Sequence, residues 1–213
     1  MSRTPSKIPF VIAASAHGPL IVNRLDYHTA GGHTFGVGIQ ILEHGAFDVT
    51  EIELTKGLLA LRRTYRGDGV VAIDCGANIG VHTIEWSKHM DGWGNNCFNA
   101  RAMHAVISSE TGKTWVPTLS HQEPASFGSL EITQRSATEQ IGQKIDYSAA
   151  SGTETAMVTL DSLNLSRCDL IKIDVEGMEL KVLEGASVTI RQHHPIIHAE
   201  FIKTDKAALV HKL

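Results

Sequence analysis

Apolar residues recur along this chain in two patterns, as short continuous runs and as runs with helical spacing. The continuous runs are rich in Val, Ile and Leu, which is typical of strands buried on both faces of a sheet. They lie at residues 70–74, 102–108, 157–160, 169–175 and 195–201. Helical spacing follows at residues 81–90 and 179–191. Because strands alternate with helices, the pattern predicts an α/β fold with a mostly parallel sheet, right-handed crossovers and flanking helices.

A further helix is predicted to begin after Asp48. Asp48 can cap the first turn, and Glu51 stands three residues later, as in a capping box. Apolar side chains recur at helical spacing along it, at Leu54, Leu58, Leu61 and Tyr65. The glycines at positions 67 and 69 are expected to end it.

The chain before this helix is predicted to form an extension. Residues 7–24 should form a β-hairpin, since two apolar runs flank a Gly-Pro turn signal. Residues 30–38 form a glycine-rich loop without the Lys-Ser/Thr pair of a P-loop. We therefore expect a hairpin-containing cap segment over residues 1–47 and the main domain over residues 48–213. The polar stretch 111–156 is expected to be mostly loop with short strand pieces, and could cover a site together with the hairpin.

Length, charge and cysteine content narrow the function classes. At roughly 150 residues per domain, 213 residues allow one α/β domain with a modest extension. The net charge is −4 without a dense Lys/Arg run, so nucleic acid is not an expected partner. Three widely spaced cysteines indicate neither a disulfide framework nor a zinc knuckle. No stretch resembles a signal peptide or reaches the ~20 apolar residues of a membrane span, so we expect a cytoplasmic protein unless a targeting segment was removed.

The strongest chemical motif is the turn after the first buried strand, Asp74-Cys75-Gly76-Ala77-Asn78-Ile79-Gly80. In open α/β sheets, ligands bind beyond the carboxyl ends of strands, where the chain turns into a helix. Gly76 would let the backbone approach a ligand, and Gly80 would let the helix start pack tightly on the strand. The Asp74 carboxylate suits a positive amino group, whereas a dinucleotide would require a G-x-G-x-x-G that Asn78 interrupts. S-adenosylmethionine therefore fits better than NAD; a tight turn without a ligand is the alternative.

The second motif places two carboxylates, Asp174 and Glu176, at the end of the strand predicted at 169–175. Paired carboxylates there can hold a substrate hydroxyl, accept its proton or bind a divalent cation. The alternative for Glu176 and for the nearby Glu179 is that they only favour the N-terminus of the next helix. We favour a functional role for Asp174 and the helix interpretation for Glu179.

In this order along the chain, the motifs resemble the FkbM family of methyltransferases. The resembling segments are residues 73–83, 159–163, 171–179, 182–186 and 195–200. The resemblance extends from about residue 36 to about residue 201. The first segment alone would indicate only a class I methyltransferase with a Rossmann-like fold.

The resemblance implies transfer of a methyl group from S-adenosylmethionine, usually to a hydroxyl oxygen on a sugar or secondary metabolite. The cofactor-binding residues that it implies are Asp74, Gly76, Ala77, Asn78, Gly80, His82 and Thr83. The implied catalytic residues are Asp174 and Glu176, facing the transferred methyl group, and Glu200 on the substrate side. One of these carboxylates could take the hydroxyl proton, or a divalent cation held by them could lower the hydroxyl pKa. The sequence does not choose between the two.

The chain departs from the family pattern in two places. Residues 95–101 separate Gly94 from the next apolar run, roughly 20 residues fewer than a strand and a crossover helix need. The family's second strand ends in an acidic residue for the cofactor's ribose, and nothing here matches it. The chain also stops at Leu213, where the family continues with a helix and closing strands. Either stretches are missing from the sequence, which we favour, or the chain is truly shortened and could be inactive.

Other chemistry is less well supported by the sequence. His193, His194 and His198 are neighbours in sequence, but Pro195 breaks any helix that would align them, so no metal site is predicted. A non-catalytic scaffold is the competing function, because of the missing acidic strand end. A NAD-dependent oxidoreductase is disfavoured by the glycine spacing.

Overall fold

The computed structural model describes residues 8–90 and 97–212. Within these ranges the elements are, in order, β1 (Phe10–Ser15), β2 (Gly18–Asn23), β3 (His28–Ala30), β4 (His33–Phe35), α1 (Val37–His44), α2 (Val49–Arg66), β5 (Ala72–Cys75), α3 (Val81–His89), β6 (Val106–Ile107), β7 (Gly112–Pro117), η1 (Phe127–Ser129), β8 (Gly152–Val158), η2 (Asp161–Leu163), β9 (Leu170–Ile173), α4 (Glu179–Glu184), α5 (Ser187–His193), β10 (Ile196–Ala199) and α6 (Lys206–Lys212). None of the helices in these ranges is long and apolar enough to cross a membrane.

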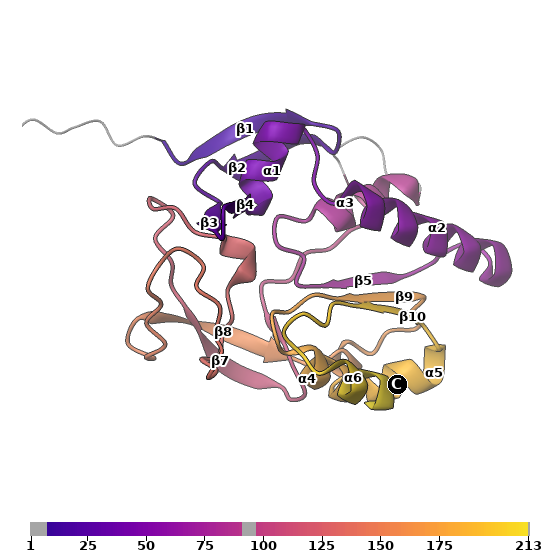
Figure 1. Cartoon of the computed structure of the whole chain (residues 1–213). Coiled ribbons are helices and arrows are strands. Elements are labelled where there is room, and N and C mark those ends of the chain that lie inside the picture. The colour runs from indigo at the N-terminus through magenta and orange to yellow at the C-terminus, as the bar shows by residue number, and fades with distance from the viewer. Residues whose placement is uncertain (1–7, 91–96, 213) are drawn as a thin grey trace, which may run out of the picture.

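Three parallel strands, β5, β9 and β10, form the central layer of the molecule (Figure 1). β9 lies in the middle and pairs with β5 on one side and β10 on the other. Helices α2 and α3 cover one face of this sheet, and α4, α5 and α6 lie on the other. The predicted alternation of parallel strands with flanking helices is confirmed for this layer.

The face toward α4 and α6 is apolar. Ile73, Ile171 and Ile197 stand in register on the three strands, and they point to the same face because side chains alternate along a strand. Ile171 belongs to a buried cluster with Val182 of α4 and Leu209 of α6, and the partly buried Ile73 and Ile197 pack against this cluster. Burial of this apolar surface is the main stabilising contribution on this side.

The opposite face, toward α2 and α3, changes character along the strands. Near the start of β9, Leu170 packs against Leu59 of α2. Two residues further along, Asp74, Lys172 and His198 stand in register across the three strands. The buried layer therefore becomes polar toward the carboxyl ends, where a ligand site is expected in such sheets.

The N-terminal segment contains two hairpins and α1. β1 and β2 pair antiparallel, which confirms the hairpin predicted over residues 7–24. The predicted glycine-rich loop is instead a second hairpin, β3–β4, with Gly31 and Gly32 in its turn at positive φ. Ile41 of α1, a helix that was not predicted, packs in one cluster with Ile52 of α2. The segment thus shares its core with the main domain.

A second small sheet, in the order β6-β8-β7, lies beyond the ends of the parallel strands. β8 pairs in parallel with β6 and antiparallel with β7. The strand predicted at 102–108 is reduced to the two residues of β6, whereas β7 and most of β8 lie in the stretch 111–156, which was expected to be mostly loop with short strand pieces. We call residues 118–151, which join β7 to β8, the cover segment. It lies on the left of Figure 1, the side toward which the parallel strands run.

The structure corrects the predicted sheet and the long helix. One mostly parallel sheet was expected, but the main domain has a parallel sheet and a separate mixed one.

α2 begins after Asp48 as predicted, yet Asp48 has a left-handed backbone and its side chain makes no capping hydrogen bond. The apolar face indicated by the spacing was also partly wrong. α2 buries Ile52, Thr55 and Leu59, while Leu54, Leu61 and Tyr65 are exposed. Periodicity shows that a helix has faces, but its neighbours decide which face is buried.

The predicted shortfall after α3 has a counterpart in the sheet. Described residues 97–105 contain no helix or strand before β6. In the described part of the chain, β5 pairs with β9 alone and forms one edge of the parallel sheet. The side of β5 away from β9 is where a crossover unit would add a strand.

Candidate active site

All three predicted catalytic carboxylates meet at the carboxyl ends of the parallel strands. Asp174 and Glu176 follow β9, and Glu200 follows β10. One carboxylate oxygen from each lies within 4.8 Å of those of the other two. We call Asp174, Glu176 and Glu200 the edge cluster. Adjacent parallel strands bring these residues together because their carboxyl ends share one edge of the sheet.

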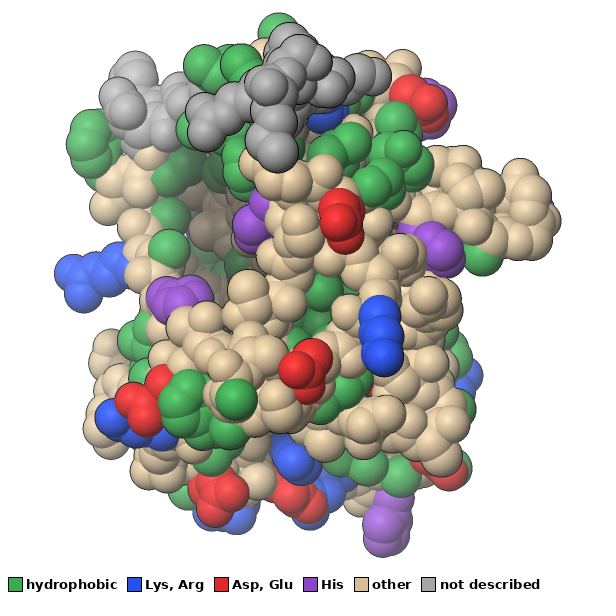
Figure 2. Space-filling view, turned by 90° about the vertical axis from the view of Figure 1, so that its left-hand side faces the viewer, with side chains coloured by type: hydrophobic (Ala, Val, Ile, Leu, Met, Phe, Trp, Pro, Cys, Tyr) green, Lys and Arg blue, Asp and Glu red, His purple; other side chains and the backbone are tan. Residues whose placement is uncertain are grey.

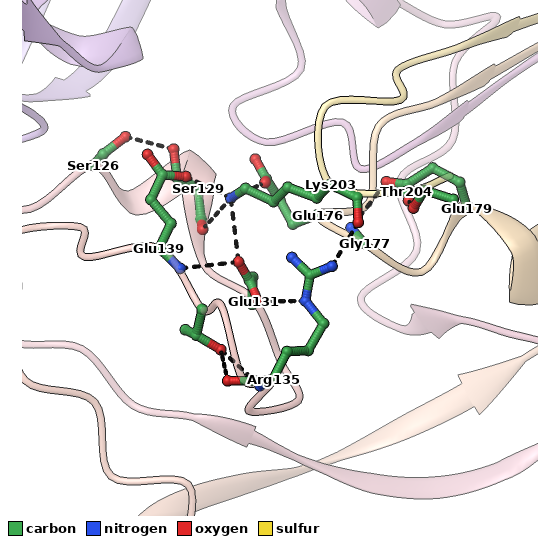
Figure 3. A network of polar contacts seen from close by, with 11 residues as sticks. Ser126, Ser129, Glu131, Arg135, Glu139, Glu176, Gly177, Glu179, Lys203 and Thr204 are labelled. Atoms are coloured by element: carbon green, nitrogen blue, oxygen red, sulfur yellow. Dashed lines mark hydrogen bonds and ion pairs between the residues drawn. The ribbon is translucent and has the colours of Figure 1, made fainter. Parts of the chain in front are cut away.

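Glu176 is held by a lysine that the sequence analysis did not identify. Lys203 Nζ lies 2.5 Å from Glu176 Oε2 and 2.7 Å from Glu139 Oε2 of the cover segment (Figure 3). Burial favours a lower pKa for Lys203, but its contacts with Glu139 and Glu176 outweigh burial and raise it. The pKa of Glu176 is also raised, because burial outweighs the effect of Lys203.

Contacts of Arg135, Glu131 and Glu139 with Lys203 fasten the cover segment over this part of the site. Glu131 is only 2% exposed, and it accepts a hydrogen bond from Arg135 Nε at 2.7 Å. Arg135 also donates to the main-chain carbonyl of Lys203 and lies directly over Gly177, where an added Cβ would be 2.8 Å from the guanidinium (Figure 3). The hydrogen bond from Arg135 holds the pKa of Glu131 below its usual value. Charged, hydrogen-bonded side chains of the cover segment therefore cover this part of the edge cluster.

Asp174 has its own lysine. Lys172 Nζ donates to Asp174 Oδ2 at 2.8 Å, and the Lys172 side chain is 5% exposed. Burial tends to lower the pKa of Lys172, but the carboxylates of Asp174, Asp74 and Glu51 outweigh it and raise the pKa. Lys172 therefore stays charged inside the sheet and forms an ion pair with Asp174.

Glu200 differs from the other two carboxylates. Among the described residues it has no ion pair with lysine or arginine, while Asp174 and Glu176 each have one. Burial, together with the negative charges of Asp174 and Glu176, raises the pKa of Glu200 to about 7, although Lys172 opposes the shift. A carboxyl group with a pKa near neutrality can accept and return a proton at physiological pH.

Asp74, at the end of β5, is oriented by the first turn of α3. Thr83 Oγ1 donates to Asp74 Oδ2 at 2.7 Å. The other oxygen, Oδ1, is buried and has no hydrogen-bond partner in the part of the chain that the structure describes. A buried acceptor without a partner is costly, so this oxygen is suited to a donor or cation supplied by a ligand. Thr83 was predicted beside the cofactor, and its contact here is with Asp74.

The glycine turn after β5 is shaped by the neighbouring strand. A Cβ on Gly76 would lie 1.6 Å from the carbonyl oxygen of Asp174, so the close backbone approach expected for a ligand is made to the chain itself. Gly80 has open space around it, so its left-handed backbone explains it better than the expected tight packing. The Ala77 carbonyl accepts the Gly80 N–H at 2.7 Å, which closes the turn. Asn78, also left-handed, touches the cover segment at Gly128.

His82 faces α2. Its Nε2 lies 3.5 Å from Glu51 Oε1 and 3.7 Å from Asp48 Oδ2, and its residue is 6% exposed. Its predicted place beside the cofactor stays a prediction. The three histidines weighed as a metal site do not come together, since His193 ends α5 and His198 lies in β10, 3.4 Å from Glu51 Oε1.

The molecular surface formed by the described residues shows no large charged patch over the edge cluster on the side that Figure 2 draws. Figure 2 looks onto the side toward which the parallel strands run, and its charged side chains are scattered over a mostly uncharged face. Two surface hollows, one on α6 and one between β3 and the cover segment, are not lined by the edge cluster. The site is therefore a half-buried polar region beneath the cover segment.

The sequence analysis missed the cations that complete this site. Lys172 left a detectable signal, because it is a charged residue inside a predicted buried strand, and such a residue requires a partner. Lys203 and Arg135 lie outside regular elements and have no periodic pattern. Only the packing of the cover segment on the strand ends brings them to the carboxylates.

Comparison with known proteins supports the resemblance found in the motifs. The family model described as the methyltransferase FkbM domain matches residues 74–211. This match begins at Asp74 and includes the whole edge cluster. Searches of curated proteins and of solved structures found no match.

Proposed function

Because the chain belongs to the FkbM methyltransferase family, we propose that it transfers a methyl group from S-adenosylmethionine to a hydroxyl oxygen of a sugar or secondary metabolite. The observation that carries the proposal is Glu200, a carboxyl group without a lysine partner and with a pKa near 7. It stands at the edge of the sheet where such folds bind their ligands.

Residues at the end of β5 fit the proposed cofactor. The free Oδ1 of Asp74 would hold the positively charged amino group, and Thr83 keeps the carboxylate turned for that contact. The turn from Gly76 to Gly80 would place its backbone beside the bound cofactor. When bound, S-adenosylmethionine would supply an electrophilic methyl group.

On the acceptor side, the members of the edge cluster would have two roles, proton removal and orientation of the acceptor. A hydroxyl is a poor nucleophile until it loses its proton, and Glu200 is the member able to take it near pH 7. Asp174 and Glu176, each held by a lysine, would accept hydrogen bonds that orient the acceptor. Alignment of the reacting atoms is the other large contribution to such a displacement.

The lysines also bear on whether a cation acts at the edge cluster. Lys172 and Lys203 already supply positive charge to Asp174 and Glu176 at hydrogen-bond distance. A divalent cation on these carboxylates would have to compete with both ammonium groups. We therefore favour a proton-accepting carboxylate over a bound metal at this place.

One observation favours a second candidate, a non-catalytic methyltransferase-like scaffold. The resemblance implies an acidic residue for the cofactor's ribose on a strand beside β5. Within the described ranges no strand lies on that side of β5. A scaffold would bind the cofactor weakly or not at all.

Calorimetry with the full chain tests both candidates. S-adenosylmethionine and its demethylated product should each bind at one site, and Asp74→Asn should weaken binding about tenfold or more, the loss of roughly one charge-assisted hydrogen bond. Asp68→Asn, at an exposed aspartate, is the matched control. Labelled methyl transfer to a panel of glycosides and hydroxylated metabolites then identifies the acceptor. Absence of cofactor binding would overturn the enzyme and favour the scaffold, whereas binding without transfer to any hydroxyl of the panel would overturn the proposed acceptor class.

A further inference from the structure

A second group of charged side chains lies between α2 and α3. Asp48 precedes α2, Glu51 lies in its first turn, and His82 lies in the first turn of α3. One ligand-type atom from each, two carboxylate oxygens and an imidazole nitrogen, lies within 4.8 Å of the others. We call Asp48, Glu51 and His82 the helix cluster. It is separate from the edge cluster, with which it shares no residue.

The Nε2 atom of His82 is buried without a hydrogen bond in the described part of the chain. The residue is 6% exposed, and its Nε2 has no hydrogen-bond partner among the described residues. The atom is nevertheless directed between two carboxylates, 3.5 Å from Glu51 Oε1 and 3.7 Å from Asp48 Oδ2. Direct N–H···O bonds would bring these atoms to about 2.7–3.2 Å. The spacing therefore leaves a buried nitrogen unsatisfied beside two acceptors, which is unfavourable.

The same spacing suits a metal ion. A tetrahedral cation with ligand bonds of about 2.0–2.2 Å holds neighbouring ligand atoms about 3.3–3.6 Å apart. We propose that Asp48, Glu51 and His82 bind one divalent transition-metal ion of the zinc class, with water at the remaining position. Zinc accepts imidazole nitrogen and carboxylate oxygen together, whereas magnesium prefers oxygen ligands.

The charges around the helix cluster agree with this assignment. Two carboxylates and a neutral imidazole balance a doubly charged ion. Lys172 is the buried cation of the neighbouring strand, but its ammonium group is bound to Asp174 at 2.8 Å. His198 lies on the far side of Glu51, its Nδ1 3.4 Å from Oε1 and likewise without a hydrogen bond in the described part. Asp48 leaves its capping hydrogen bond unmade, so its carboxylate is available to the cluster.

A bound ion would connect two parts of the fold that flank the candidate active site. Glu51 belongs to α2, while His82 directly follows the turn that carries Asp74, Gly76 and Gly80. The ion would thus anchor the start of α3 to α2. This role does not depend on methyl transfer, so the metal site can be tested without the cofactor.

Titration of the metal-stripped full chain with Zn²⁺, Mn²⁺ and Mg²⁺ near neutral pH tests the proposal. We expect one Zn²⁺ per chain, weaker Mn²⁺ binding and little Mg²⁺ binding. Glu51→Gln and His82→Gln should each weaken Zn²⁺ binding more than about 100-fold, since even a residue that only supports a ligand contributes about 10- to 100-fold. Glu53→Gln and His89→Gln, exposed neighbours on the same helices, are matched controls that should bind as the unaltered chain does.

Further measurements separate a lost ligand from a lost fold. Circular dichroism of the metal-free variants checks folding, and Zn²⁺ should raise the unfolding midpoint of the unaltered chain and the controls alone. Co²⁺ should give a visible absorption band that Glu51→Gln removes. No saturable Zn²⁺ binding, or binding that folded Glu51→Gln retains, would overturn the site. The first result would instead indicate that His82 lies between the two carboxylates without a metal ion.

Discussion

The edge cluster and the helix cluster both place acidic side chains near the same end of the parallel sheet, yet their partners differ. In the edge cluster, Lys172 and Lys203 lie at hydrogen-bond distance from two of the three carboxylates. In the helix cluster, the nearby bases are histidines: His82 Nε2 stands 3.5 Å or more from both carboxylates without a hydrogen bond, and His198 Nδ1 lies 3.4 Å from Glu51. Lysines of the described chain thus balance negative charge in the edge cluster, whereas the helix cluster keeps a buried nitrogen without a hydrogen bond.

The difference shows that proximity of carboxylates alone does not define a site. Lys172 and Lys203 pair with Asp174 and Glu176, whereas Glu200 has no such partner among the described residues and its pKa is raised to about 7. An unpaired, buried imidazole between two acceptors leaves room for a cation instead. The first arrangement suits proton transfer, and the second suits metal binding.

The largest expected effect comes from removing the titrating carboxyl. Glu200→Gln should lower the rate of methyl transfer about 10²- to 10⁴-fold, the usual contribution of a general base, and leave cofactor affinity unchanged. The rate is measured with the acceptor that the panel identifies. Glu184→Gln, at an exposed glutamate paired with Lys212, is the control. An unchanged rate in Glu200→Gln would assign proton removal to another member of the edge cluster.

Removing a lysine tests whether the edge cluster depends on its cations. Lys203→Met should lower the free energy of unfolding by about 3–5 kcal/mol, because it leaves buried Glu131 and Glu176 without their ammonium partner. Lys212→Met breaks an exposed pair and should cost within about 1 kcal/mol. Urea unfolding at pH 7.5 measures both. Equal losses would mean that the ion pairs of Lys203 contribute no more than surface pairs.

The pH dependence of Glu200 should have opposite signs for activity and for stability. Methyl transfer should rise as pH increases through about 7, since only the ionised carboxylate accepts a proton. The folded chain holds a proton that the unfolded chain releases near its ordinary pKa of 4.5, so this group's contribution to stability falls between pH 4.5 and about 7. Glu200→Gln should therefore be more stable than the unaltered chain at pH 8, by about 1 kcal/mol after allowing for solvent screening. Rate profiles and urea unfolding at pH 5 and 8 check both signs, and the same stability difference at both values would contradict the assignment.

The smallest effect is expected in the helix cluster when no metal is present. With a chelator, His82→Gln should change the free energy of unfolding by about 1 kcal/mol or less, since His82 makes no hydrogen bond through Nε2 and its carboxylate neighbours are about one-third exposed. With saturating Zn²⁺ the difference should widen. A large loss in the chelated sample would show that His82 already stabilises the fold as a charged group.

Patterns within one segment predicted much of this molecule. The N-terminal hairpin, the start of α2 and the turn from Asp74 to Gly80 follow from local signals, namely turn residues, a helix start and a strand followed by glycines. The acidic residues of the edge cluster were found because they end apolar runs. Local signals were wrong where packing against other elements determines the outcome. Leu54 and Leu61 of α2 are exposed, and Asp48 makes no capping hydrogen bond.

By itself, the sequence determined the family, the alternation of β5, α3, β9, α4 and β10, and the carboxylates at the strand ends, because each depends on residues close together in the chain. Only the tertiary structure decided what each carboxylate contacts. Lys203 reaches Glu176 from beyond β10, Arg135 reaches Gly177 from the cover segment, and His82 reaches Glu51 from another helix. The pKa and the ligand preference of a charged group depend on such distant partners and on burial, and neither is encoded in the spacing of its own segment.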